Sequence, residues 1–387
     1  MELSLPFFIS RDDSDGLTKI ATPTQSPREL QYMDRRRFLK TTSGLVGVAG
    51  VSGCLQRLGF ETQSAWRDPP LVEDRPDGVY YPAIVEGMGV YETTTVNGIG
   101  VALMHSFPHR FWTVTGPNKT KVVVSSDDSL HLMASVWDVE SGTVLPTAVS
   151  VDIQNEEGNV STTNLWSMLS PNMGFHYGDN VALSGSGEYE VTVRIAPVQA
   201  ARTSPFKGRF TETRTAQLQF TFEPSETYDL PIRRLDDKAG TRGTVELMQM
   251  DGVPAPVAPP KEQLPGRLLG EASADDAVFC TSLVDEERRF PETDGPYLVV
   301  SPRTPYNRVL LPGMSLSMVV ERDGKAVLET GLDGTLDPDL GYYYGTTAAE
   351  VERGDTVTVR IETPPQVSRH DGYETAFMQM SAVQFTV

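Results

Sequence analysis

The chain has 387 residues, a formal net charge of -19 and a sequence pI near 4.7. This length suits two or more domains that each bury a core. So acidic a chain lacks the basic footprint of nucleic-acid-binding proteins, and no nucleic-acid partner is expected. An acidic, solvated surface is typical of proteins from high-salt environments and favours a halophilic, haloarchaeal origin.

The N-terminal part carries an export signal. Residues 33–54 read MDRRRFLKTTSGLVGVAGVSGC, in which Arg35–Lys40 matches the twin-arginine pattern. The apolar run that follows is too short to span a bilayer and fits a signal peptide. Its end, VSGC, resembles a lipobox, which predicts a lipid on Cys54 and an anchor to the extracytoplasmic face of the cell membrane. Because signal peptides begin at the N-terminus, Met33 is the expected start, and residues 1–32 are expected to be a gene-model artefact or an unusual extension.

The remainder divides at composition changes. Residues 55–75 are predicted to be a polar tether, residues 76–222 a first repeat, and residues 269–387 a second. Between the repeats, residues 223–268 include VPAPVAPPKEQLPG, which is typical of a semi-rigid Pro-rich spacer. Cys280 is the other cysteine, so a lipidated Cys54 would leave no intrachain disulfide.

The repeat is visible in several aligned segments, and such a repeat fixes the architecture. LPTAVSVDIQNEEGNVSTTNLWSMLSPNMGFHYG (145–178) recurs as LPGMSLSMVVERDGKAVLETGLDGTLDPDLGYYYG (311–345). EYEVTVRIAP (188–197) recurs as DTVTVRIETP (355–364). Upstream the copies align without a gap, which places His131 opposite Tyr297.

Both copies contain short strand-like runs rich in Val, Thr and aromatic residues and bounded by Gly, Asn, Asp and Pro. No stretch has sustained helical periodicity with capping signals. The pattern predicts an all-β fold of two tandem immunoglobulin-like antiparallel β-sandwiches. The clearest expected strands are Val101–Met104, Val122–Ser125, His131–Trp137, Ala148–Ile153, Tyr189–Ile195, Leu218–Phe222, Leu310–Glu321, Thr356–Ile361 and Ala376–Val387.

Histidines and methionines gather in the first repeat. The candidate metal ligands are His105, His109, His131, His176, Met133, Met168 and Met173. His131 and Met133, two positions apart on a strand, share a face, and a loop at the same end of a sandwich can bring other ligands to it. Imidazole and thioether donors suit copper, particularly Cu(I), and accommodate Fe(II) or Zn(II) less selectively.

Each candidate also has a structural interpretation. The three methionines and His131 can be ordinary core residues, and His105 and His109, in MHSFPH (104–109), ordinary loop residues. The second repeat keeps Gly341 and Gly345 at the positions of Gly174 and Gly178, but it has Tyr343 at the position of His176. The comparison therefore favours a glycine frame that is structural and histidines that are functional.

The segment MGFHYGDNVALSGSGEYEVTVRI (173–195) resembles the bacterial periplasmic metal-binding proteins associated with high-affinity ferrous-iron uptake. Those proteins carry a G-P-H-Y-G-x-N segment followed by a G-x-Y strand, and the resemblance extends over residues 96–222. It implies an immunoglobulin-like sandwich, often dimeric, that binds copper and sometimes other divalent metals.

The resemblance also implies site residues. His131, His176 and Met168 match ligands of the family, whereas Met133 replaces a glutamate. A further family histidine has no counterpart in residues 206–210. Met173, His105 or His109 could fill this gap. The segment SRHD (368–371) in the second repeat resembles the missing loop, but the rest of a site is absent there.

Three functions are compatible with these observations. The first is a lipid-anchored extracytoplasmic protein that binds copper or iron and captures it or delivers it to a membrane transporter such as a metal permease, with a homodimer as a further expectation. The second is an enzyme, which is disfavoured because the chain has no nucleophile elbow, phosphate loop, zinc-protease helix or paired-carboxylate signature. The third is a cell-surface structural or interaction module without a metal role.

Overall fold

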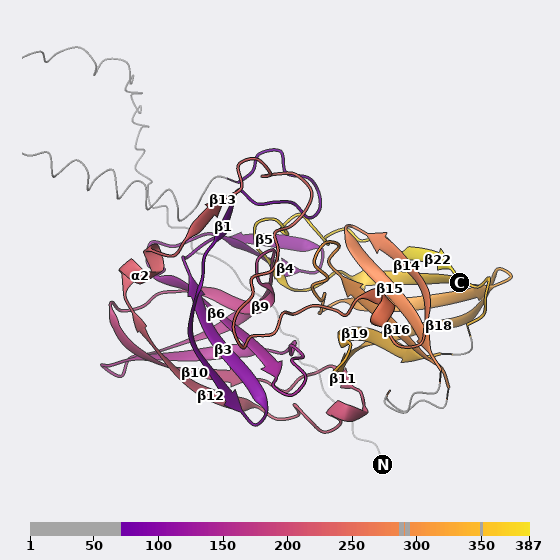
Figure 1. The fold of residues 1–387 in the computed structure, drawn as a ribbon, viewed down its shortest axis with the longest axis horizontal. Helices are drawn as coiled ribbons and strands as arrows, with labels where there is room; N and C mark the ends of the chain where they lie inside the picture. The colour runs from indigo at the N-terminus through magenta and orange to yellow at the C-terminus, as the bar shows by residue number, and fades with distance from the viewer. Residues whose placement is uncertain (1–70, 286–289, 291–294, 349–350) are drawn as a thin grey trace, which may run out of the picture. The chain divides into compact units, whose positions relative to one another are not determined.

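The computed structural model describes residues 71–285, 290, 295–348 and 351–387. The export signal, Cys54, residues 1–32 and most of the predicted tether lie outside the described residues. The described residues belong to one compact unit. None of the helices among them has the length and apolarity to cross a membrane. The described chain is almost entirely β-structure, which confirms the all-β prediction (Figure 1).

The first repeat forms one large sheet, coloured indigo to magenta in Figure 1. Its strands follow the spatial order β12-β10-β7-β8-β9-β6-β3-β2, and β12 packs against β2, so the sheet nearly closes into a barrel. The strands are β2 (Gly89–Val96), β3 (Ile99–Ser106), β4 (Phe111–Thr115), β5 (Asn118–Val122), β6 (Leu130–Asp138), β7 (Val149–Asn155), β8 (Val160–Ser170), β9 (Gly174–Val181), β10 (Gly187–Ile195) and β12 (Arg214–Phe222).

The second repeat forms an equivalent sheet in orange and yellow, in the order β14-β15-β16-β19-β18-β17-β20-β22. Here β14 packs against β22, so this sheet also nearly closes. Its strands are β14 (Arg267–Ala274), β15 (Ala277–Val284), β16 (Tyr297–Arg303), β17 (Ser315–Arg322), β18 (Lys325–Asp337), β19 (Gly341–Thr347), β20 (Thr356–Thr363) and β22 (Val383–Thr386). The sequence predicted two sandwiches, and the structure shows two nearly closed, barrel-like sheets. The immunoglobulin-like topology stays a prediction.

Local sequence explains these strands. Along β10 and β12, buried and more exposed residues alternate, as expected for strands with one face on the core. β3 and β6 are buried at every position, because both of their faces are covered. The turn between β2 and β3 is Asn97-Gly98, and both residues have positive φ, the conformation that a tight two-residue hairpin requires.

The segment between the repeats packs on the rest of the unit. It contains α2 (Pro224–Tyr228), β13 (Ile232–Arg234) and the short 3-10 helix η2 (Lys261–Gln263), and it buries Ala258 completely. β13 pairs with β1 (Ile84–Glu86), which fixes the strand that carries Glu86.

Each repeat donates a two-residue strand to the sheet of the other. β11 (Ala201–Arg202), which precedes the 3-10 helix η1 (Ser204–Phe206), lies parallel to β18 of the second sheet, and β21 (Ser368–Arg369) lies parallel to β8 of the first. The two pairings are equivalent: Ala201 pairs with Thr335 and Ser368 pairs with Met168, and Thr335 and Met168 are at matching positions of the two repeats. The backbone N–H that follows each strand donates to the opposite sheet at 3.0 Å, from Thr203 to the Leu336 carbonyl and from His370 to the Leu169 carbonyl. The exchange therefore carries His370 into the first repeat.

Candidate metal centre

Four neighbouring strands form the platform of the site. In the order β8-β9-β6-β3, Met168 on β8 lies directly opposite His176 on β9, and Met133 on β6 lies opposite Gly178 on β9. Since directly paired residues and residues two apart point to one face, Met168, His176, Met133 and His131 share that face. The predicted shared face of His131 and Met133 is therefore present.

Gly178 leaves an opening in the middle of this face. A Cβ atom at this position would lie 2.6 Å from Nε2 of His131 and 3.3 Å from Sδ of Met168. Only a residue without a side chain leaves these two donor atoms facing the same small space.

His131 and His176 present buried nitrogen atoms to this region. Nδ1 of His131 is 2.9 Å from Oδ1 of Asn180, and Nδ1 of His176 is 3.1 Å from the Gly174 carbonyl oxygen. Both partners are acceptors, so each neutral imidazole carries its proton on Nδ1 and a lone pair on Nε2. Both Nε2 atoms are buried and have no hydrogen-bond partner among the described residues. A ring proton directed to a carbonyl or amide oxygen, with the other nitrogen free, is the usual state of a metal-binding histidine.

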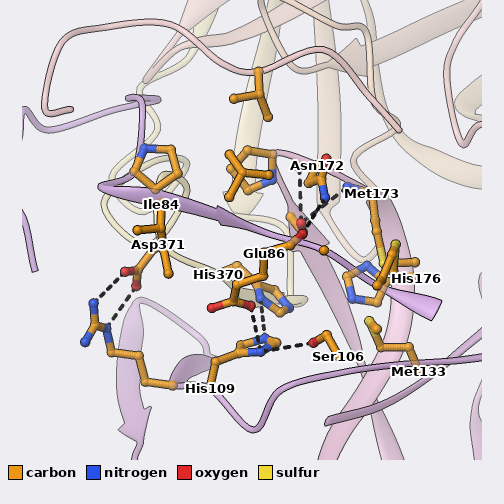
Figure 2. A pocket seen from close by; sticks show the side chains of 18 residues that line it. Ile84, Glu86, Ser106, His109, Met133, Asn172, Met173, His176, His370 and Asp371 are labelled. Atoms are coloured by element: carbon orange, nitrogen blue, oxygen red, sulfur yellow. Dashed lines mark hydrogen bonds and ion pairs between the residues drawn. The ribbon is translucent and has the colours of Figure 1, made fainter. Parts of the chain in front are cut away.

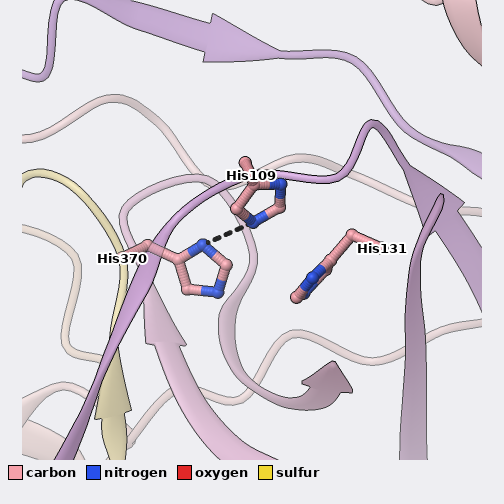
Figure 3. Close-up of side chains that lie close together, drawn as sticks. All are labelled: His109, His131 and His370. Carbon is pink, nitrogen blue, oxygen red and sulfur yellow. Dashed lines mark hydrogen bonds between the residues drawn. The ribbon is translucent and has the colours of Figure 1, made fainter. Parts of the chain in front are cut away.

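His370 completes the cluster from the second repeat. Its Nε2 is 3.2 Å from Sδ of Met168, and its ring centroid lies 5.3 Å from that of His176 and 5.6 Å from that of His131. Ligand atoms of His109, His131 and His370 lie within 4.8 Å of one another, a group that can hold a metal ion (Figure 3). Sequence reasoning assigned the SRHD segment to its own repeat and so missed His370. The signal that could have found it was the match of this segment to the loop that the first repeat lacks.

The segment around His370 is held firmly. Asp371 accepts hydrogen bonds from Arg110 at 3.2 and 2.7 Å, which ties it to the residue preceding β4. Further along, the fully buried Glu374 accepts from the Tyr80 hydroxyl at 2.6 Å and from the Gly372 backbone N–H at 2.9 Å. Such a buried, well-bonded loop fixes a ligand position well.

Burial keeps most of these imidazoles neutral. It lowers the pKa of His176 to about 4 and lowers the pKa values of His131 and His370 well below their ordinary range. His109 differs: burial opposes its charge, but the carboxylate of Glu86 beside it raises its pKa overall. Neutral imidazoles are the form that binds a metal.

A cavity of about 80 Å³ adjoins the cluster (Figure 2). Its lining includes Glu86, His109, Met133, Met173 and His176. Met133 and Met173 therefore lie beside the cluster, on the wall of this cavity. The cavity therefore leaves open space next to the cluster, and Glu86 lies on its wall.

His105 lies elsewhere. Its neighbour Ser106 pairs with His131, so His105 points to the opposite face of β3, where its ring stacks on Tyr91 with centroids 3.9 Å apart. Burial lowers its pKa to about 4. The structure thus does not bring His105 to the cluster.

The second repeat has the same frame with other residues. Tyr343 pairs with Thr335 as His176 pairs with Met168, and Val299 pairs with Gly345 as Met133 pairs with Gly178. A Cβ atom on Gly345 would lie 2.4 Å from the Tyr297 hydroxyl. The Tyr297 ring stacks on Phe290 at 4.5 Å and meets Tyr343 edge-on at 6.4 Å. Aromatic side chains therefore occupy the space that the first repeat leaves open.

Two family models match different parts of the chain. Residues 126–231 match the family model described as Fe2+ transport protein, and residues 262–386 match a domain of unknown function (DUF7350). No curated protein matches the chain.

Solved structures of FetP from uropathogenic Escherichia coli strain F11 are similar to part of the chain. A copper-bound variant is 19% identical, with 36% of this chain and 92% of that chain covered and a TM-score of 0.28. The protein as isolated is 19% identical, with 36% and 95% covered and a TM-score of 0.27. The first repeat of this chain resembles the Fe2+ transport protein family.

Proposed function

We propose that this chain is an extracytoplasmic metal-binding protein that holds one soft metal ion between its two repeats. The ligands are Nε2 of His131, His176 and His370 and Sδ of Met168. The observation that carries the proposal is the pair of buried Nε2 atoms of His131 and His176, which have no partner among the described residues and share a strand face with Met168. Leaving two such nitrogens buried without a partner costs free energy that a bound ion would recover.

The donor set favours Cu(I). Three neutral imidazoles and a thioether are soft to borderline donors, and this ligand set has no carboxylate. Met133, which replaces the glutamate expected from the family, makes the surroundings softer still. Fe(II) is the alternative cargo, since the matching family is described by Fe2+ transport.

The role we propose is capture of the ion outside the cytoplasm and delivery to a membrane transporter. A lipid on Cys54, following the twin-arginine signal, would hold the protein at the membrane surface. The second repeat acts as a scaffold that supplies His370. At the position equivalent to the cluster it has Tyr297 and Tyr343, which favours a structural or docking role for the rest of this repeat. The chain is proposed to bind and transfer the ion without catalysing a reaction.

The test is a Cu(I) titration of the mature chain against a competing chelator. We expect one equivalent to bind tightly, and the double substitution His131→Ala with His176→Ala to abolish this binding. His105→Ala is the matched control, because it removes a buried histidine of the same repeat outside the cluster. Stoichiometric binding that survives the double substitution would refute the site.

A further inference from the structure

The imidazole of His109 is held by two acceptors on the same nitrogen. Its Nδ1 lies 2.8 Å from the carbonyl oxygen of Phe107. The same atom lies 3.0 Å from Oε2 of Glu86, and Figure 2 shows these two side chains side by side. A carbonyl and a carboxylate can only accept, so Nδ1 of His109 must carry a proton. In the neutral ring, Nε2 then has the lone pair.

That lone pair faces His370. Nε2 of His109 is 3.0 Å from Nδ1 of His370 (Figure 3). An ion bound to Nε2 of His370 requires the proton of that ring to be on Nδ1, and Nε2 of a neutral His109 is the acceptor for this proton. Nε2 of His370 is then left with its lone pair, and this nitrogen lies beside Sδ of Met168. The bond at His109 thus decides which nitrogen of His370 is free.

We propose that His109 is a positioning residue for the metal centre, which with Glu86 and the Phe107 carbonyl selects the tautomer of His370 that can bind the ion. This proposal rests on the proposed function. It makes His109 an outer partner of a ligand, although its atoms lie close enough to those of His131 and His370 to form a three-histidine group. Nδ1 of His109 contacts two oxygen acceptors and its Nε2 contacts Nδ1 of His370. The Nε2 atoms of His131 and His176 instead have no partner among the residues that the structure describes, and Nε2 of His370 faces Sδ of Met168, itself a proposed ligand.

The other two ligand histidines support this role. The Nδ1 protons of His131 and His176 go to oxygen acceptors, which admit one tautomer only. The acceptor of His370 is another imidazole, which can donate as well as accept. Such a partner selects a tautomer only if its own proton is fixed, and the two oxygens at Nδ1 of His109 do this.

The backbone at His109 is tied to the same centre. Asn180, which accepts from Nδ1 of His131, also donates to the His109 carbonyl at 2.9 Å and accepts from its N–H at 3.3 Å. One side chain therefore orients His131 and anchors the residue that orients His370. Outer partners of this kind typically change metal affinity by about 10- to 100-fold when they are removed.

The test replaces His109 by three residues of different hydrogen-bonding character. His109→Gln keeps an acceptor at the position of Nε2, His109→Leu removes it, and His109→Lys offers donors only. We expect Cu(I) affinity close to that of the wild type for His109→Gln, and a loss of about 10- to 100-fold for His109→Leu, with the greatest loss for His109→Lys. Equal losses in all three variants, or none in any, would overturn the proposal. Thermal melts exclude variants that do not fold.

A second readout does not depend on metal. Nitrogen NMR of the metal-free protein at alkaline pH, where imidazoles are neutral, reports which nitrogen of His370 carries the proton. We expect Nδ1–H in the wild type and Nε2–H in His109→Lys, whereas the amide of His109→Gln can donate or accept and selects neither form. A wild-type His370 protonated on Nε2 would refute the selection of its tautomer by His109. If the wild type bound no Cu(I) but gave the expected tautomers, the proposed function would fail and the role of His109 in tautomer selection would stand.

Discussion

His370 and Met168 come from different repeats, and their Nε2 and Sδ atoms lie 3.2 Å apart. The contact exists because β21 of the second repeat pairs with β8 of the first, with Ser368 beside Met168. The proposed ligand set, incomplete within the first repeat, is thereby completed by the second. The cluster is assembled within one copy of the chain.

The opening at Gly178 predicts a specific loss of binding. In Gly178→Ala, the new Cβ would lie 2.6 Å from Nε2 of His131, so this ring must move out of the cluster. We expect a large loss of Cu(I) affinity. The effect on the melting temperature should be small, because the atoms that must move lie at the outer ends of the His131 and Met168 side chains. Gly331→Ala is the control, since a Cβ atom there would meet no described atom within 4 Å. Equal Cu(I) affinity of the two variants would contradict the assigned position of the ion.

Burial of the histidines predicts a pH-dependent stability. Burial lowers the pKa of His176 from 6.5 to about 4. The unfolded chain therefore takes up a proton at His176 in a pH range where the folded chain does not, and stability is full above pH 6.5 and falls as the pH drops toward 4. The contribution of this residue is on the order of 3 kcal/mol, at about 1.36 kcal/mol per pKa unit.

Denaturant unfolding of the metal-free protein at both ends of this pH range measures the effect. We expect His176→Gln to lose less stability on acidification than the wild type does, because Gln does not titrate. Parallel pH profiles of the two proteins would show that His176 is not buried in its neutral form.

The frame shared by the two repeats predicts that a metal site can be built in the second one. Thr203, Tyr297, Thr335 and Tyr343 stand where the first site has His370, His131, Met168 and His176. Replacing them with His, His, Met and His, respectively, should raise the bound Cu(I) from one to two equivalents, measured by elemental analysis after desalting. The wild type should retain one. A folded variant that still binds one equivalent would show that the shared frame is not sufficient for binding.

Much of this arrangement follows from sequence. The alternation along β6 places His131 and Met133 on one face, and the repeat marks His131 and His176 as departures from a shared frame. The all-β class follows from short Val- and Thr-rich runs with tight turns. These features are local, or they come from comparing two segments of the same chain.

The remainder depends on contacts that local patterns do not encode. The placement of His370 requires a two-residue strand to pair with a sheet in the other repeat, and two residues are too few for a periodic signal. The sequence predicts a strand that ends at Met104, which leaves the direction of His105 open. The structure extends β3 through Ser106, and the alternation of side chains then turns His105 away from His131.

The proposed anchor gives a separate prediction. If a lipid on Cys54 holds the protein at the membrane, the wild type should fractionate with membranes, and Cys54→Ser should fractionate as a soluble exported protein. Cu(I) affinity should be the same for both, because residue 54 precedes the described residues that contain the site. Membrane association that persists in Cys54→Ser would refute the lipid anchor and leave the metal site unaffected.

The central feature proposed for this protein is one ion bound by ligands from both repeats. X-ray absorption spectroscopy of the Cu(I)-loaded protein, compared with His370→Ala, tests it most directly. We expect three nitrogen ligands and one sulfur in the wild type, and the loss of one nitrogen with weaker binding in His370→Ala. An unchanged ligand shell in His370→Ala, or a wild-type shell without sulfur, would contradict a site shared between the repeats.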